Sequence, residues 1–84
     1  MKPKYIVYDF ENEFNIELFL KIAKQEGFNL EGKLVFSPHP NLPKKNCICP
    51  TKGNNNAQGY LYDNELYVRP GEFGAGLRDV ADNF

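Results

Sequence analysis

Hydrophobic residues recur along this chain with two different spacings, one typical of helices and one typical of strands. These spacings predict one main helix and several short strands. Between residues 13 and 26 an apolar residue recurs every third or fourth position, which places these side chains on one face of a helix. The stripe consists of Phe14, Leu18, Phe19, Ile22 and Ala23. We expect Asn15 to cap the start of this helix, with Asn12 as the alternative cap one turn earlier, and Gly27 to end it.

Three other segments have the composition or the period of two that is typical of strands. Residues 4–10 are apolar on both faces, so we expect this strand to lie inside a sheet rather than at its edge. Residues 33–36 predict a second strand, and the order strand, helix, strand fits either a βαβ unit or its antiparallel variant. Residues 58–69 predict a hairpin that turns at Asp63 and Asn64, because both residue types tolerate positive φ.

Residues 37–58 differ in character from the segments around them. They hold four of the six prolines and the run Gly53-Asn54-Asn55-Asn56, and these residue types favour turns over regular strands. We expect a long irregular loop here, interrupted at most by a short strand at 46–49, and one or two helical turns at about 77–83. The predicted fold is a single small α+β domain over residues 1–84. It has one main helix packed on a mixed or antiparallel sheet of three to five strands, a long loop rich in Pro and Asn, and a C-terminal hairpin.

Composition and charge exclude several classes of protein. The chain carries 10 Lys and Arg against 11 Asp and Glu, which excludes a strongly basic nucleic-acid-binding protein. No apolar run approaches the roughly 18–20 residues of a membrane span. Asp9, Glu11 and Glu13 interrupt the N-terminal apolar run, so we expect a cytoplasmic protein with no signal peptide and no membrane contact. A chain of 84 residues builds only a small core, so a homo-oligomer or a bound partner would add to its stability.

The register of the hairpin predicts a candidate binding surface. Pairing across the turn puts Leu61, Leu66 and Val68 on one face, which is the natural core face. The opposite face then carries Tyr60, Tyr62, Tyr67 and Arg69. Tyrosine and arginine are enriched in binding hot spots. Two interpretations stay open: the helix or the proline-rich loop covers these tyrosines, or they form an exposed patch.

Patterns that would indicate catalysis or metal binding are weak in this sequence. His39, Cys47 and Cys49 share one loop, but structural zinc takes four ligands and usually a Cys-x2–4-Cys step. The surrounding stretch has no acid to complete the set, and a Cys–His pair has no orienting third group here. The glycine-rich run 71–76 lacks the spacing and the lysine of a phosphate-binding loop. We therefore expect no catalytic residue, no metal and no cofactor.

The favoured function is that of a non-catalytic protein-binding module. The tyrosine face with Arg69 would anchor a protein partner, and Lys44 and Lys45 in the loop would add polar contacts. The abundance of Asn, Lys, Phe and Tyr is typical of AT-rich genes, so we interpret the chain as a bacteriophage-type accessory protein that binds and modulates or inhibits a host enzyme or complex. The alternative is a single-stranded nucleic-acid binder, in which bases stack on the tyrosines beside the basic loop.

Overall fold

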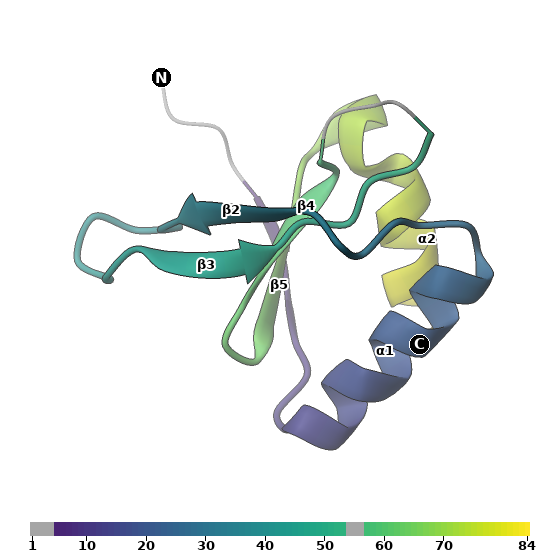
Figure 1. The fold of residues 1–84 in the computed structure, drawn as a ribbon, viewed down its shortest axis with the longest axis horizontal. Helices are drawn as coiled ribbons and strands as arrows, with labels where there is room; N and C mark the ends of the chain where they lie inside the picture. The colour runs from purple at the N-terminus through teal and green to yellow at the C-terminus, as the bar shows by residue number, and fades with distance from the viewer. Residues whose placement is uncertain (1–4, 54–56) are drawn as a thin grey trace.

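The computed structural model describes residues 5–53 and 57–84, which form a five-stranded sheet and two helices (Figure 1). A single 3-10 turn, η1 (Gly71–Gly74), precedes the second helix. In chain order the elements are β1 (Ile6–Asp9), α1 (Glu13–Gln25), β2 (Lys33–Phe36), β3 (Lys45–Ile48), β4 (Gly59–Tyr62), β5 (Glu65–Val68) and α2 (Ala75–Asp82). The chain is therefore an α+β protein, as the sequence predicts, although two helices rather than one contribute to its core.

The sheet is antiparallel throughout, with the strand order β1-β5-β4-β3-β2. Strands β2 to β5 follow one another as a meander, and β1 lies at the far edge beside β5. The helix α1 therefore connects strands at opposite edges, and β1 and β2 form neither a βαβ unit nor an antiparallel pair with each other.

The prediction that the first strand lies inside the sheet is wrong, because β1 is an edge strand. Its Ile6 and Val7 are 40% and 46% exposed. The strand is apolar on both faces because each face has its own packing partners. Tyr8 packs against the core, whereas Val7 lies opposite Tyr67 on the other face.

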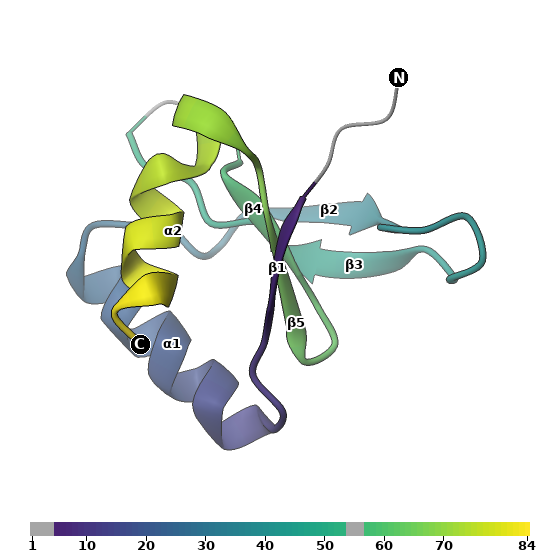
Figure 2. The same ribbon diagram turned by 180° about the vertical axis from the view of Figure 1, so that it is seen from behind.

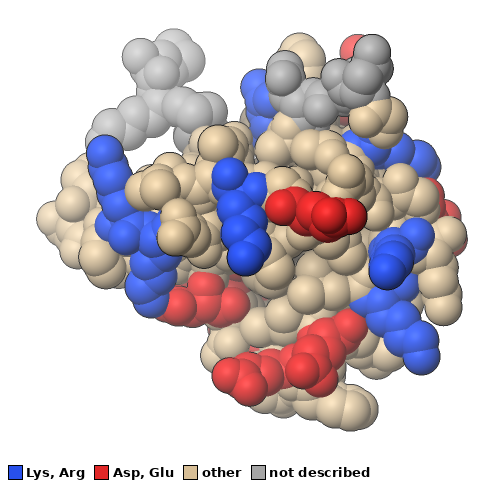
Figure 3. All heavy atoms as spheres, viewed as in Figure 1, with Lys and Arg blue, Asp and Glu red and all other residues tan. Residues whose placement is uncertain are grey.

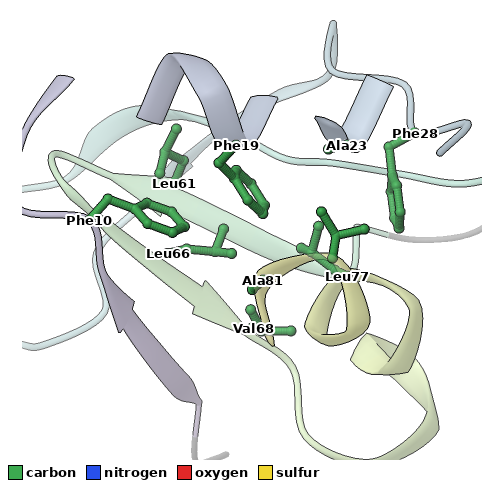
Figure 4. Packing of buried hydrophobic residues seen from close by; sticks show 10 residues of the cluster. Phe10, Phe19, Ala23, Phe28, Leu61, Leu66, Val68, Leu77 and Ala81 are labelled. Carbon is green, nitrogen blue, oxygen red and sulfur yellow. The ribbon is translucent and has the colours of Figure 1, made fainter. Parts of the chain in front are cut away.

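Both helices cover one face of the sheet, whereas the β2–β3 hairpin extends away from them (Figures 1 and 2). Figure 4 shows Phe19 from α1, Leu66 from β5 and Leu77 from α2 pointing into the space between these elements; all three are fully buried. The rest of the core cluster consists of Phe10, Ala23, Phe28, Leu61, Val68, Val80 and Ala81. In the described parts of the chain, neither helix is long and apolar enough to cross a membrane.

The start of α1 differs from the favoured prediction. Asn12, not Asn15, is the N-cap: its side chain accepts a hydrogen bond from the backbone N–H of Asn15 at 2.9 Å. The Asn15 side chain instead donates to the carbonyl of Phe10 at 3.0 Å, which ties the helix to the end of β1. Burial in α1 is centred on Phe19 and Ala23, and Phe14 is 73% exposed.

The C-terminal hairpin has the predicted register. Asp63 adopts a φ of 52° in the turn, and Tyr62 lies opposite Glu65 and Tyr60 opposite Tyr67. A two-residue turn fixes the pairing of the strands that flank it. The region predicted as a loop over 37–58 is divided by β3, which begins at Lys45, one residue before the short strand expected there; residues 54–56 lie outside the described residues.

Candidate protein-binding face

The face of the sheet opposite the helices carries a cluster of four aromatic rings. Tyr60 and Tyr67 are directly paired across β4 and β5, so they lie side by side. Tyr5, just before β1, meets both rings edge-on at centroid distances of 6.0 and 6.2 Å. Phe36, at the end of β2, stacks on Tyr60 at 4.2 Å with an interplanar angle of 12°. The aromatic face, as we name it here, consists of Tyr5, Phe36, Tyr60, Tyr67, Arg69 and Phe73.

Phe36 reaches Tyr60 because the sheet is strongly bent between β3 and β4. These two strands pair at one position, Ile48 opposite Leu61, whereas β2 and β3 pair over four positions. The β2–β3 hairpin is thus free to leave the plane of β4 and β5 (Figure 1). This bend brings the end of β2 over β4 and closes the ring cluster.

Two hollows lie on either side of Tyr5. The first has a volume of about 420 Å³ and lies under the 37–44 loop. Its lining residues are Tyr5, Phe36, Ser37, Pro38, His39, Pro40, Leu42 and Lys44. The second, of about 270 Å³, is lined by Tyr5, Tyr60, Arg69, Pro70 and Phe73. The side chain of Tyr5 therefore separates two concave sites that are both lined by rings.

The 37–44 loop, which walls the first hollow, is held by its own hydrogen bonds. Ser37 Oγ lies 2.7 Å from the carbonyl oxygen of His39 and 2.8 Å from that of Leu42. The backbone N–H of Asn41 donates to Nδ1 of His39 at 3.2 Å, so this nitrogen is an acceptor. Leu42 N–H closes the turn by donating to the His39 carbonyl at 3.0 Å.

Two of the residues predicted to bind a partner instead hold the base of this loop. Tyr62 lies on the predicted face but is only 3% exposed, and its hydroxyl donates to the carbonyl of Pro43 at 2.6 Å. Lys45 Nζ lies 5.1 Å from the centre of the Tyr62 ring and 2.7 Å from a carboxylate oxygen of Asp63. Tyr62 and Lys45 are thus engaged within the chain, whereas Lys44 lines the first hollow.

Tyr67 is fixed within the cluster by a carboxylate. Its hydroxyl donates to Oε1 of Glu65 at 2.7 Å. Burial of the ring and this hydrogen bond raise the pKa of Tyr67 to about 12. Burial also raises the pKa of Tyr60. Both phenols are therefore neutral at physiological pH and can act as hydrogen-bond donors.

The second hollow is bounded by an exposed aromatic residue and an arginine. Phe73 is 67% exposed, and the Arg69 guanidinium carbon lies 4.9 Å from the centre of its ring. Within the described ranges 5–53 and 57–84, no ion pair or side-chain hydrogen bond is found for the Arg69 guanidinium. Its donors can therefore bind a group other than the described residues, while the contact with the Phe73 ring helps to hold the guanidinium in place.

The two cysteines are structural rather than reactive. Cys47 and Cys49 are free thiols that are 1% and 2% exposed. Burial raises the pKa of each, so neither is a thiolate at neutral pH. Among the residues that the structure describes, no group of three or more His, Cys, Asp or Glu side chains is placed to hold a metal ion.

Three members of the aromatic face, Tyr5, Phe36 and Phe73, were not among the site residues predicted from the sequence. Both Tyr5 and Phe36 come from segments far from the hairpin in sequence: the pairing of β1 with β5 brings Tyr5 to it, and the bend of the sheet brings Phe36. Phe73 lies in the glycine-rich run 71–76, for which the sequence predicted no binding role; the structure places it in η1, beside Arg69. For Phe73 the one signal in the sequence was its position, four residues after Arg69 at the end of the predicted hairpin.

Charges of both signs lie on the side of the molecule seen in Figure 3, with Lys and Arg interspersed among Asp and Glu. On this side the Lys and Arg residues that the structure describes therefore alternate with acidic ones. No protein-family model, curated protein or solved structure matches the chain. Its function is accordingly inferred from its own geometry.

Proposed function

We propose that the chain is a non-catalytic, cytoplasmic protein-binding module that docks on its partner through the aromatic face. The observation that carries this proposal is the pair of hollows on either side of Tyr5, bounded by rings and by two cationic side chains, Lys44 and Arg69. Concave, ring-lined sites with an arginine at the margin have the composition of binding hot spots. In line with the composition of the chain, we propose a host enzyme or complex as the partner and modulation of its activity as the result.

The exposure of Phe73 supports this role. A phenylalanine that is 67% exposed leaves most of a large apolar surface in water, and a partner that covered it would gain hydrophobic free energy. Phe73 lies beside a hollow and under a guanidinium, so that a partner would bury it together with its neighbours. Hot-spot residues in protein interfaces occupy such sites.

A matched pair of variants tests the proposal. Phe73→Ala removes an exposed ring from the aromatic face, and Phe14→Ala removes a ring that is 73% exposed on α1, on the other side of the sheet. With a tagged chain as bait in bacterial lysate, we expect Phe73→Ala to weaken capture of a stoichiometric partner by about 2 kcal/mol, roughly thirtyfold in Kd. Phe14→Ala should bind normally. Equal effects of the two variants, or none, would contradict the proposal.

Nuclease treatment and a salt series of the same capture experiment distinguish the nucleic-acid alternative. A single-strand binder would lose its bound material on nuclease treatment, and its affinity would fall steeply with salt. The pairing of Lys45 with Asp63 and the hydrogen bond of Tyr67 to Glu65 place two carboxylates beside the tyrosines. Neither carboxylate lines the two hollows, but a phosphate backbone that ran along the whole face would pass close to both, so we expect capture that survives both treatments.

A further inference from the structure

The two hollows have a shape that restricts what can bind to them. They share one residue, Tyr5, and lie on either side of it. A ligand that fills both must therefore place two apolar groups across one ring. The flanks of the hollows are also rigid and flat, because prolines line the first (Pro38 and Pro40) and the second (Pro70) together with aromatic rings.

An extended chain in the polyproline II conformation meets this requirement. It has three residues per turn, so side chains three positions apart project from the same side. Proline-rich segments of this kind dock in grooves lined by aromatic residues, because the segment is ordered before it binds and loses little entropy. Their backbone makes no internal hydrogen bonds, so its carbonyl oxygens need donors from the groove.

The aromatic face supplies such donors. No hydrogen bond to another described residue is found for the hydroxyls of Tyr5 and Tyr60, although both rings are packed in the cluster. No buried side-chain nitrogen or oxygen is left without a partner in the parts of the chain that the structure describes. These two hydroxyls must therefore reach solvent, where they can donate to the carbonyls of a bound segment.

Charge at the hollows selects an acidic segment. Lys44 lines the first hollow and Arg69 the second, and among the described residues no carboxylate lines either of them. The planar guanidinium of Arg69 is suited to a carboxylate, which it can bind through two parallel hydrogen bonds. A basic segment would instead place like charges together.

We propose that the aromatic face binds an extended, proline-containing, acidic segment of the partner protein. Its prolines occupy the two hollows on either side of Tyr5, and one of its carboxylates binds Arg69. This inference rests on the proposed function and assigns the chemistry of the bound partner.

The test is selection of a random peptide library on the purified chain, followed by affinity measurements on the enriched peptides. We expect the enriched sequences to share two prolines about three positions apart with a nearby Asp or Glu. Arg69→Gln should weaken the binding of such a peptide by about tenfold or more, because it removes a charge-assisted bidentate contact. Arg69→Lys should recover only part of this loss, because lysine keeps the positive charge but cannot form two parallel hydrogen bonds to one carboxylate.

Lys21→Gln is the matched control. It also removes one positive charge, but from an exposed position on α1, which covers the other face of the sheet. It should bind the selected peptides like the unmodified chain, and far-UV circular dichroism should show that every variant is folded. The inference is overturned if no peptide is enriched, if the enriched sequences lack the prolines or the acid, or if Arg69→Gln and Lys21→Gln bind equally well. If any of these outcomes occurs while Phe73→Ala still weakens partner capture, this inference fails and the proposed function stands. If Phe73→Ala also leaves partner capture unchanged, both fail.

Discussion

Gly59 allows the helix α2 to pack directly on the sheet, and an added methyl group there should destabilise the fold. Gly59 is the first residue of β4 and is buried. A Cβ at this position would lie 2.7 Å from the carbonyl oxygen of Tyr67 and 2.9 Å from Cδ2 of Leu77. Cβ atoms essentially never come within 3.0 Å of such atoms. The substitution Gly59→Ala therefore requires the backbone of β5, as well as a core side chain of α2, to move.

The loss of stability expected for Gly59→Ala follows from the atoms that must move. Overpacking a core costs about 1–3 kcal/mol, and the upper part of this range applies because the closest atom belongs to backbone. Replacing a strand glycine by alanine returns about 0.5–1 kcal/mol of chain entropy. The expected net loss is about 2 kcal/mol, from a total stability on the order of 5–10 kcal/mol for a chain of this length. The corresponding fall in Tm is roughly 8–16 °C.

Gly76→Ala provides the control for this measurement. Its Cβ would lie 3.3 Å from Oε1 of Gln58, which accepts a hydrogen bond from the backbone N–H of Leu77 at 3.0 Å and must shift by only a few tenths of an ångström. Alanine is favoured over glycine inside a helix such as α2 by about 1 kcal/mol, which offsets this shift. Urea unfolding followed by far-UV circular dichroism should show Gly59→Ala less stable than the unmodified chain and Gly76→Ala within about 0.5 kcal/mol of it or more stable. If Gly59→Ala unfolds at the same urea concentration as the unmodified chain, the close packing of α2 on β4 is refuted.

Three further predictions concern the tyrosines, the thiols and the helix cap. Burial, followed by a hydrogen bond to a carboxylate, raises the pKa of both Tyr8 and Tyr67 to about 12. Their contribution to stability is therefore complete below the unfolded pKa of about 10 and is lost as the pH rises from about 10 to 12. Absorbance titration should show Tyr8 and Tyr67 ionising last among the five tyrosines, and five equal titrations would contradict this. Cys47 and Cys49 should resist a thiol reagent in the folded chain and both react in urea, because burial raises the pKa of each; rapid labelling without urea would show that they are accessible. Asn12→Ala should cost about 1 kcal/mol of stability and Asn12→Ser almost nothing, as measured by urea unfolding; equal losses would show that the cap is not the cause.

Local rules explain why the hairpin could be predicted in detail. Asp63 and Asn64 form a two-residue turn, and such a turn determines the register of both strands beside it. The alternation of side chains then assigns every residue of β4 and β5 to a face, which places Leu61 and Leu66 in the core as expected. No information from outside residues 59–68 is needed for this result.

The errors arise where distant segments meet. The strand at residues 4–10 was assigned to the sheet interior because both its faces are apolar, and the sequence does not show that, among the described strands, it pairs with β5 alone. Phe36 joins the aromatic face through a bend at a single β3–β4 pair, which no spacing in the sequence indicates. Tyr62 was included among the partner-binding residues while exposure and covering of its face both stayed open, because alternation gives the face of a side chain but not whether Pro43 and Lys45 cover it.

The position of β1 in the sheet has a consequence for the order of folding. The β4–β5 hairpin joins neighbouring residues, whereas pairing of Ile6 with Val68 closes a loop of about sixty residues, which costs more chain entropy. We therefore expect the hairpin to form early and β1 to dock late. Because Tyr5 directly precedes β1 and separates the two hollows, a chain whose first strand has not docked has the hairpin tyrosines but no divided groove. Only a chain that has folded completely would then bind the partner.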